Sequence, residues 1–511
     1  MGSNLLYKAS IVTTPTAYGV GVLNSIKPAQ SFGEELVTNG NFDTDSGWIK
    51  GTGWSIANGK ASKVAGSATE LIQLGTFPSD FSSKTFKIAF NLEVTAGSVR
   101  LRAGLNNQSY LNSSGSYVYS LTPTGNDQLK FGADSSFVGS IDSVSVVEVT
   151  DADFDFTRTS SATRVNPDYL IETELTDIPR LDYTNGTASI LLEPQSTNLI
   201  AYSQDFSSYL VVLGIITESG FTDPSGTTTA YKLTNFAINS SRFDYNTPTA
   251  AVNGTTYTYS AYYKGSGTIR INCSTSTGVG GSGEKDIVLT NEWKREEISF
   301  TAINPTGNVK THTAITRTAN NNAIVYLAFT QIEALTYPTS YIPTSGQSGG
   351  VTRAAETLNN AGNSDLINST EGVLYCEIAA LTDLGSYRLI SLSDGNLNQR
   401  ITILYDITDN KIYGQCVNST TQAFIPFVPT SISNMNKIAF KYKANDFALW
   451  VNGVEVGVDT SGVIPTGLDK LSFDRGDGVD DFYGKCKTIA VFKEALSDTE
   501  LACLTSTNNR E

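Results

Sequence analysis

Short runs of alternating apolar and polar residues cover most of the chain. In residues 437–443, Ile438, Phe440 and Tyr442 alternate with lysine and alanine, which is the pattern of a strand with one buried face. Similar segments rich in Val, Ile, Tyr, Phe and Thr recur between turns of Gly, Asn, Asp and Ser. They include residues 86–94, 99–103, 257–263, 268–273 and 323–333. This pattern predicts an all-β chain of serial antiparallel β-sandwiches.

One hairpin can be placed from the sequence. The dipeptide Asn452-Gly453 separates two apolar runs at residues 447–451 and 454–458. Asn-Gly favours a type I′ turn, because both central residues of that turn need a positive φ. The sequence therefore predicts a β-hairpin here.

A short helix is predicted near the C-terminus. Ser497 and Glu500 have the spacing of a capping box, in which the first residue caps the helix and the Glu reaches back to it. Leu496 and Leu501 flank this box at the positions of a hydrophobic staple. We expect the helix to pack on the last sandwich.

Two stretches of the chain share one order of features, which indicates an internal repeat. The first begins near residue 35, passes Phe42 and Trp48, and ends with the run 141–146. The second begins near residue 198, passes Phe206 and Tyr209, and ends near residue 333. With the Gly/Ser-rich segment 344–350, the repeat suggests six regions. These are an N-terminal segment (1–33), a first module (34–150), a connector (151–197), a second module (198–345), a linker (346–371) and a terminal domain (372–511).

Composition excludes several classes of function. The formal charge is −15 and no basic block is present, so binding to DNA or RNA phosphates is not expected. The single histidine, His312, excludes sites that need two or three of them, such as most catalytic zinc centres. No apolar run approaches the roughly 18–20 residues of a membrane span, and the first 25 residues lack a signal-peptide core. We therefore expect no membrane insertion.

The five cysteines form no CxxC pair. Because four of them lie in the last third of the chain, one disulfide there is an alternative, but buried free thiols are the simpler interpretation. They are Cys273, Cys376, Cys416, Cys486 and Cys503.

Several segments resemble known families. DFTRTSSATRVNPDYLIET, IPRLDY, LLEPQSTNL, YPTSYIPTSGQ and TRAAET are similar to segments that recur in bacteriophage tail-fibre and head-fibre proteins. ELVTNGNFDTDSGW, at residues 35–48, resembles the start of jelly-roll carbohydrate-binding modules. From about Gly372, GVLYCEIAAL, FALWVNGVEV and DFYGKCKTIAVFKEALSDTELACLTS resemble the concanavalin A-like, laminin G-like lectin sandwich.

The resemblance implies two jelly-roll modules and a lectin-like domain in a phage virion appendage. Its N-terminal segment would attach to other virion proteins, and its sandwiches would bind host-surface glycans during adsorption. Such fibres are commonly homotrimers, assembled in the host cytoplasm and exposed on the particle. On this view the chain is not an enzyme. The alternatives are a virion-borne or secreted polysaccharide depolymerase, and a purely structural capsid decoration or tail-assembly protein.

Aromatic residues near amides and carboxylates are the candidates for glycan binding, since sugars stack on aromatic faces and bond through their hydroxyls. Trp48 and Trp54 would form a platform with Asn41 and Asp43, and Trp450 is a further candidate beside the predicted hairpin. The alternative is that the indoles fill the sandwich cores, where large aromatic residues are usually buried.

A Gly-rich acidic segment, DRGDGVDDF, is the candidate metal site. Asp474, Asp477, Asp480 and Asp481 could supply oxygen ligands to Ca²⁺, and the sequence suggests no other cofactor. The alternative is a solvated turn. For catalysis, a Ser-His-Asp site would have to use His312, and the chain has no GxSxG elbow, so a hydrogen-bonded strand histidine is expected.

Overall fold

The computed structural model describes residues 5–236, 240–315, 322–383, 387–406 and 410–507. The described residues form antiparallel sheets, one α-helix and three short 3-10 helices, which confirms the predicted all-β sandwich class. The 3-10 helices are η1 (Leu5–Lys8), η2 (Phe81–Ser83) and η3 (Phe206–Ser208). The chain divides into two compact units. One comprises Lys27–Ala152, and the other comprises Met1–Ile26 and Asp153–Glu511.

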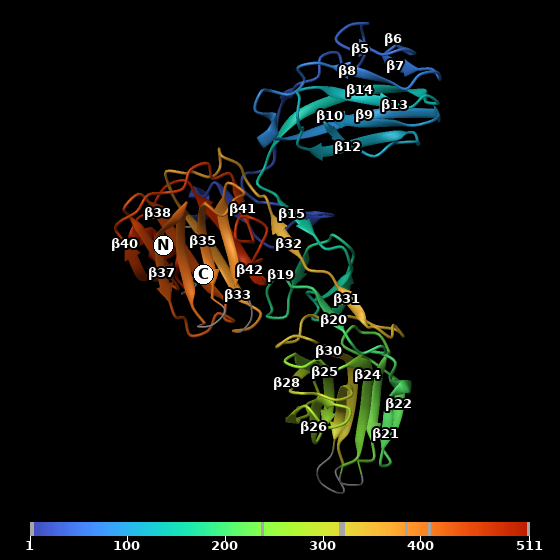
Figure 1. Ribbon diagram of the computed structural model, residues 1–511, viewed down its shortest axis with the longest axis vertical. Helices are drawn as coiled ribbons and strands as arrows, with labels where there is room; N and C mark the ends of the chain where they lie inside the picture. Colours follow the sequence, from blue (N-terminus) through green and yellow to red (C-terminus); the bar gives the residue numbers. More distant parts are fainter. Residues whose placement is uncertain (1–4, 237–239, 316–321, 384–386, 407–409, 508–511) are drawn as a thin grey trace. The chain divides into compact units, whose positions relative to one another are not determined.

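The first module is a sandwich of two sheets, drawn blue to cyan (Figure 1). One sheet has the order β12 (Gly115–Leu121), β9 (Thr85–Ala96), β14 (Val138–Thr150), β7 (Lys60–Lys63) and β6 (Trp54–Ala57), with β4 (Ser31–Glu35) also on β14. The other has the order β11 (Asn106–Asn107), β10 (Val99–Ala103), β13 (Leu129–Ala133), β8 (Thr69–Gln73) and β5 (Ile49–Lys50). Along β9, Phe86, Ile88 and Phe90 are buried and alternate with partly exposed residues, so one face of the strand lines the core.

The second module repeats this architecture. Its first sheet runs β28 (Lys294–Thr301), β25 (Thr256–Ser266), β30 (Ile324–Glu333), β23 (Ala230–Thr234) and β22 (Ile216–Phe221). Its second sheet runs β27 (Ser282–Val288), β26 (Thr268–Thr275), β29 (Asn308–Ile315), β24 (Arg242–Ala250) and β21 (Leu210–Val212). Every strand corresponds in chain order to the strand at the same place in the first module, so the topology confirms the internal repeat.

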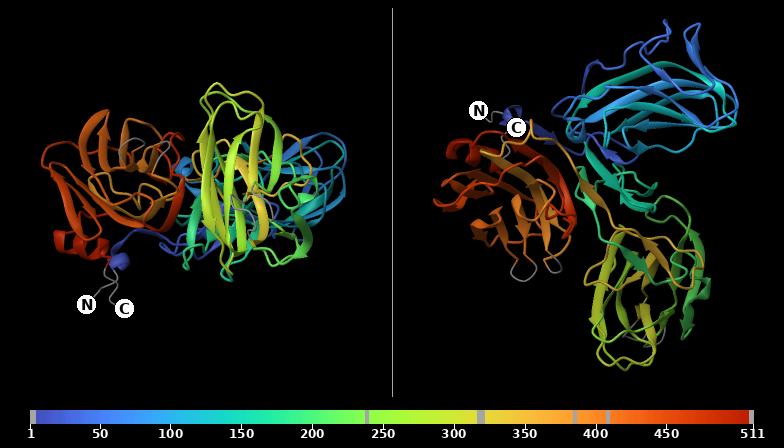
Figure 2. Two further views of the ribbon diagram at one scale, coloured as in Figure 1. Left: turned by 90° about the horizontal axis from the view of Figure 1, so that it is seen from below. Right: turned by 45° about the horizontal axis from the view of Figure 1, so that its top comes forward.

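The C-terminal sandwich, drawn orange to red, also has two sheets (Figures 1 and 2). The larger has the order β18 (Arg180–Asp182), β19 (Ser189–Leu192), β42 (Gly484–Phe492), β33 (Glu371–Ala380), β38 (Asn436–Lys443), β39 (Phe447–Val451) and β40 (Val454–Asp459). The smaller has the order β37 (Thr420–Phe427), β36 (Ile412–Asn418), β35 (Gln399–Tyr405), β34 (Arg388–Ser393) and β41 (Lys470–Ser472). The sheets approach closely where a Cβ on Gly414 would lie only 2.5 Å from the ring of Phe440.

Both local predictions for this sandwich are confirmed. Asn452 and Gly453 have φ values of 51° and 90° between β39 and β40, as a type I′ turn requires. The helix α1 (Asp498–Thr505) begins after Ser497, whose backbone N–H donates to the Glu500 carboxylate at 2.9 Å. Leu496 and Leu501 are buried in one apolar cluster on the sheet.

The N-terminal segment is part of the fold. The strand β1 (Ile11–Thr13) is fully buried and pairs with β42 of the C-terminal sandwich. Residues from Ser31 belong to the first module through β4, so that module begins earlier than the expected boundary at residue 34.

Three small sheets complete the structure. They are β2 (Tyr18–Gly19), β3 (Val22–Leu23), β15 (Phe154–Thr157) and β32 (Thr357–Asn359); β16 (Ala162–Val165) with β17 (Ile171–Glu174); and β20 (Ser196–Asn198) with β31 (Val351–Arg353).

A buried network of ion pairs joins the connector to the segment after the second module. Glu356 accepts from Arg158 Nη1 at 2.7 Å and from Arg180 Nε at 2.8 Å. Glu193 pairs with Arg180 Nη2 at 2.9 Å and with Arg353 Nη1 at 2.8 Å. All five side chains are almost completely buried. The motifs that resemble fibre proteins therefore meet in three dimensions, although they lie up to about 200 residues apart.

All five cysteines are free thiols, which agrees with the simpler expectation; only Cys503 is exposed. Among the described residues, no helix is long and apolar enough to span a membrane.

Candidate functional site

The prediction that Trp48 and Trp54 form an exposed platform is wrong. Trp48 and Trp54 are each 7% exposed and belong to the apolar core of the first module. Trp48 packs against Phe131, with ring centroids 6.2 Å apart, and its indole N–H donates to the backbone oxygen of Asn39. Alternation along β6 turns Trp54 inward, so the core interpretation holds for both residues.

The remaining glycan candidates are not brought together. Asn41 and Asp43 are exposed beside these buried indoles, so they have no aromatic platform to complete. Trp450 is 7% exposed and packs under helix α1 with Leu501. The sequence could not reveal that the helix covers this strand, because the two elements meet only in the folded sheet.

The acidic segment holds an arginine at its centre. Arg475 Nη2 lies 2.9 Å from Asp477, and Arg475 Nη1 lies 3.1 Å from Asp480. Asp474 is buried and accepts the backbone N–H of Gly476 at 2.5 Å. Burial raises the pKa of Asp481 to about 6, which neighbouring carboxylates reinforce and a hydrogen bond from Tyr483 opposes.

These contacts correct the calcium prediction. Asp477 and Asp480 are both paired with Arg475, and Asp474 accepts the backbone N–H of Gly476, so three of the four carboxylates are engaged within the loop. Within the described part of the chain, no group of three or more His, Cys, Asp or Glu side chains is arranged to hold a metal ion.

A polar groove of about 280 Å³ lies on the second module, on the outer face of the sheet β21-β24-β29-β26-β27. Three of its lining residues, Glu284, Asn272 and His312, belong to one row of directly paired residues across four strands. Glu284 on β27 is opposite Asn272 on β26, which is opposite His312 on β29, which is opposite Asp244 on β24. The neighbours of Asn272 along β26, Ile271 and Cys273, point into the core. Alternation along the strands therefore aims the whole row outward.

Asp244 organises one end of this row. It is 1% exposed and bonds His312 Nδ1 at 2.5 Å, Arg242 Nε at 2.7 Å and Lys310 Nζ at 3.0 Å. Burial acts to raise the pKa of Asp244, but the hydrogen bond with His312 and the nearby cations outweigh it and lower the pKa. The carboxylate stays ionised and fixes the imidazole ring, which confirms the expected hydrogen-bonded strand histidine. Within the described residues Nε2 of His312 has no hydrogen-bond partner, and the ring lines the groove.

Asn272 carries an unused acceptor. The side chain is 3% exposed, its Nδ2 lies 3.5 Å from Glu284, and its Oδ1 has no hydrogen-bond partner. A buried amide oxygen without a partner costs about 1–3 kcal/mol, so a ligand that donates to it would recover that cost. Ser274 and Ser282 add hydroxyls to the same groove. Donors and acceptors thus alternate over a short distance, as hydroxyl-rich ligands require.

Little in the sequence indicates this groove. Its residues are spread from Arg242 to His312, and only the pairing register of four strands brings them together. Asn272 and Glu284 have no motif around them, so alternation along each predicted strand was the one usable sign.

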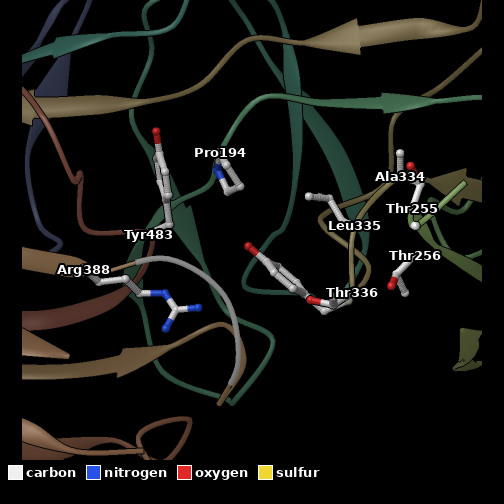
Figure 3. Close-up of a pocket in the computed structure, with 10 residues that line it drawn as sticks. Pro194, Thr255, Thr256, Ala334, Leu335, Thr336, Arg388 and Tyr483 are labelled. Atoms are coloured by element: carbon white, nitrogen blue, oxygen red, sulfur yellow. The ribbon is translucent and has the colours of Figure 1, made fainter. Parts of the chain in front are cut away.

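A second cavity, of about 450 Å³, lies within the larger unit (Figure 3). Arg388 and Tyr483 of the C-terminal sandwich line one side, and Leu335 and Thr256 line the other. Arg388 is 2% exposed, and burial lowers its pKa. The lining is more apolar than that of the groove, with fewer groups that could bond hydroxyls.

Comparisons with known proteins add little to this picture. No family model and no curated protein matches the chain. A solved structure titled Ruminococcus gnavus IT-sialidase CBM40 bound to alpha2,3 sialyllactose is similar over 29% of this chain and 94% of its own, at 15% identity and a TM-score of 0.24. The tandem CBM22-1-CBM22-2 domain from Paenibacillus barcinonensis Xyn10C covers 60% of this chain and 100% of its own, at 9% identity and a TM-score of 0.25. At these TM-scores neither likeness bears on the ligand.

Proposed function

We propose that this chain is a non-enzymatic glycan-binding protein of a bacteriophage virion, a fibre or spike whose β-sandwiches bind host-surface glycans. The observation that carries the glycan-binding part is the row Glu284–Asn272–His312–Asp244, with its unused Asn272 Oδ1. Sugar hydroxyls both donate and accept hydrogen bonds, and the groove offers both roles. Weak binding at one such groove would become useful through many copies on a particle.

The virion part of the proposal rests on the fibre-like motifs. Arg158, Arg180, Glu193, Arg353 and Glu356 come from those motifs and form the buried network, so the resemblance involves residues with a shared structural role. The N-terminal segment would contact other virion proteins, and the protein would be a homotrimer on the particle exterior. The C-terminal sandwich would act as a concanavalin A-like, laminin G-like lectin domain.

A glycan array probed with the full chain tests the binding part. We expect selective binding that is weakened by Asn272→Ala and by Glu284→Gln. Glu218→Gln is the matched control, because Glu218 lies on β22 in the other sheet of the same module. Binding at background would instead favour a purely structural capsid decoration or tail-assembly protein. Immunogold labelling of purified particles tests the location, and unlabelled virions would contradict it.

A polysaccharide depolymerase is the second candidate. The Asp244–His312 contact at 2.5 Å is the orienting half of an acid–histidine–nucleophile arrangement. Among the described residues, however, no serine, threonine or cysteine side chain is hydrogen-bonded to His312. Incubation of the protein with host capsule separates the two candidates, since only a hydrolase produces new reducing ends.

A further inference from the structure

The outer sheet face of the first module carries a row equivalent to the groove of the second. In the first module Asn107, Arg102, Lys130 and Ile72 are paired across β11, β10, β13 and β8. They stand where Glu284, Asn272, His312 and Asp244 stand in the second module. The row therefore has the same position in both modules, but its side chains differ in chemistry. Two carboxylates, an amide and an imidazole in the second module correspond to two cations, an amide and an isoleucine in the first.

This face has an excess of positive charge in an acidic protein. Arg100, Arg102 and Lys130 point outward, and Glu70 is paired with Arg102. Lys130 is 8% exposed, and among the described residues its ammonium has no hydrogen-bond or ion-pair partner. Arg100 has a buried Nε without a hydrogen-bond partner, and no carboxylate in the described chain lies within ion-pair distance of it. Three cations thus face one carboxylate.

The surroundings of these cations suit a sugar ring. Tyr110 is 51% exposed and lies with its ring 4.9 Å from the Arg100 guanidinium carbon. Gly132 lies between Arg100 and Glu70 in the pairing register, so no side chain stands between them. Ile72 and the half-exposed Ile49 extend the row beyond Lys130 with apolar surface.

We infer that this face, formed by Arg100, Arg102, Lys130 and Tyr110, binds an anionic saccharide, a sugar chain that carries carboxylate or sulfate groups. The inference rests on the proposed glycan-binding function and adds a second site with a different ligand class. Lys130 and Arg100 bond the anion, and Tyr110 stacks on the ring. A nucleic acid is the other polyanion that such a face would attract, and single-stranded DNA is therefore one of the probes in the test.

Isothermal titration of the full chain with oligogalacturonate, dextran sulfate, neutral dextran and single-stranded DNA tests the inference. We expect binding to oligogalacturonate or dextran sulfate that weakens with added salt, and none to neutral dextran at this face. Which of the two probes binds identifies the anion. Lys130→Gln and Arg100→Gln should each weaken binding about tenfold, because each removes a charge-assisted hydrogen bond.

The control is Lys60→Gln, which removes the same charge from β7 in the other sheet of the module and should leave the affinity unchanged. A thermal melt checks that each variant is folded. Failure of both acidic probes to bind, binding of single-stranded DNA as tight as that of the acidic probes, or Lys130→Gln and Arg100→Gln variants that bind as tightly as the wild type would each overturn the inference. If the chain binds glycans on the array and Asn272→Ala weakens that binding, the proposed function stands even when this inference fails.

Discussion

Arg180 and Glu356 are 176 residues apart in the chain and form a bidentate, fully buried ion pair, with Arg180 Nε 2.8 Å from Glu356 Oε1. The second module lies between them in the sequence. Glu356 also holds Arg158 and the backbone N–H of Glu193, so one carboxylate binds three separate segments of the connector region. This contact therefore holds together the segment before the second module and the segment after it.

Loss of the Glu356 charge should destabilise the larger unit strongly. Glu356→Gln leaves Arg158 and Arg180 buried with too little negative charge, and breaking such a pair from one side costs about 3–5 kcal/mol. Urea unfolding of the full chain measures the change. The control is Glu296→Gln, which breaks a solvent-exposed pair with Lys285 and should cost less than about 1 kcal/mol. Equal effects of the two substitutions would contradict this role of the network.

Stability should fall in acid through Glu193. Burial acts to raise the pKa of Glu193, but Arg353 and Arg180 outweigh it and hold the pKa at about 2. Because the folded pKa lies below the ordinary value, this stabilisation is present above about pH 4.5 and is lost as the pH falls toward 2. Melting temperatures of the wild type and Glu193→Gln should differ at pH 7 and converge near pH 2. A constant difference would refute the assignment.

Asp481 should have the opposite pH dependence. Its folded pKa of about 6 lies above the ordinary value, so the folded state holds the proton more tightly than the unfolded state does. Asp481 therefore favours folding most below about pH 4, and this advantage disappears as the pH rises through 6. We expect Asp481→Asn to raise the melting temperature at pH 8 and to leave it unchanged at pH 4. No gain at pH 8 would argue against the raised pKa.

Trp48 should matter for stability and not for glycan binding. Trp48→Ala opens a cavity against Phe131 and should cost about 3–5 kcal/mol, while the folded fraction keeps its affinity for glycans. Tyr110→Ala, at a half-exposed aromatic residue of the same module, should change the stability by less than about 1 kcal/mol. Calorimetric unfolding and glycan titration of both variants make the comparison. A Trp48→Ala protein of normal stability but weaker binding would restore the platform interpretation.

The first module should be removable as a unit. Asn24 Nδ2 and the backbone N–H of Ser25 both bond Asp153, at 2.9 and 2.6 Å, so the chain leaves and re-enters the larger unit at one point. Replacing residues 28–151 with a short Gly/Ser linker should leave a folded protein with the melting transition of the larger unit intact. Circular dichroism and calorimetry would reveal a failure as loss of that transition.

Local features of the fold could be predicted from the sequence, and long-range ones could not. The Asn452-Gly453 turn and the Ser497–Glu500 capping box depend on neighbouring residues alone, and both are present. The burial of Trp450 depends on a helix about 50 residues further along. The local pattern of residues carries no information about which element covers a given side chain. For the same reason the groove of the second module could not be predicted.

The partner of Arg180 could not be predicted, because Glu356 lies beyond an entire module in the sequence. The repeat could be predicted because it preserves order, which sequence records directly. What each repeat binds depends on cross-strand register, which is settled only when the sheet forms.

The paired strands β20 and β31 also determine how the chain responds to tension. Residues 196–198 run antiparallel to residues 351–353, so the second module hangs as a loop closed at its base. Tension applied to the chain on either side of the second module reaches the pair of Ser196 and Arg353 before it reaches the module, and Arg353 is held by Glu193. The backbone of the second module carries none of the force until the strands β20 and β31 separate. A binding surface placed in such a loop keeps its shape while the rest of the molecule is under strain.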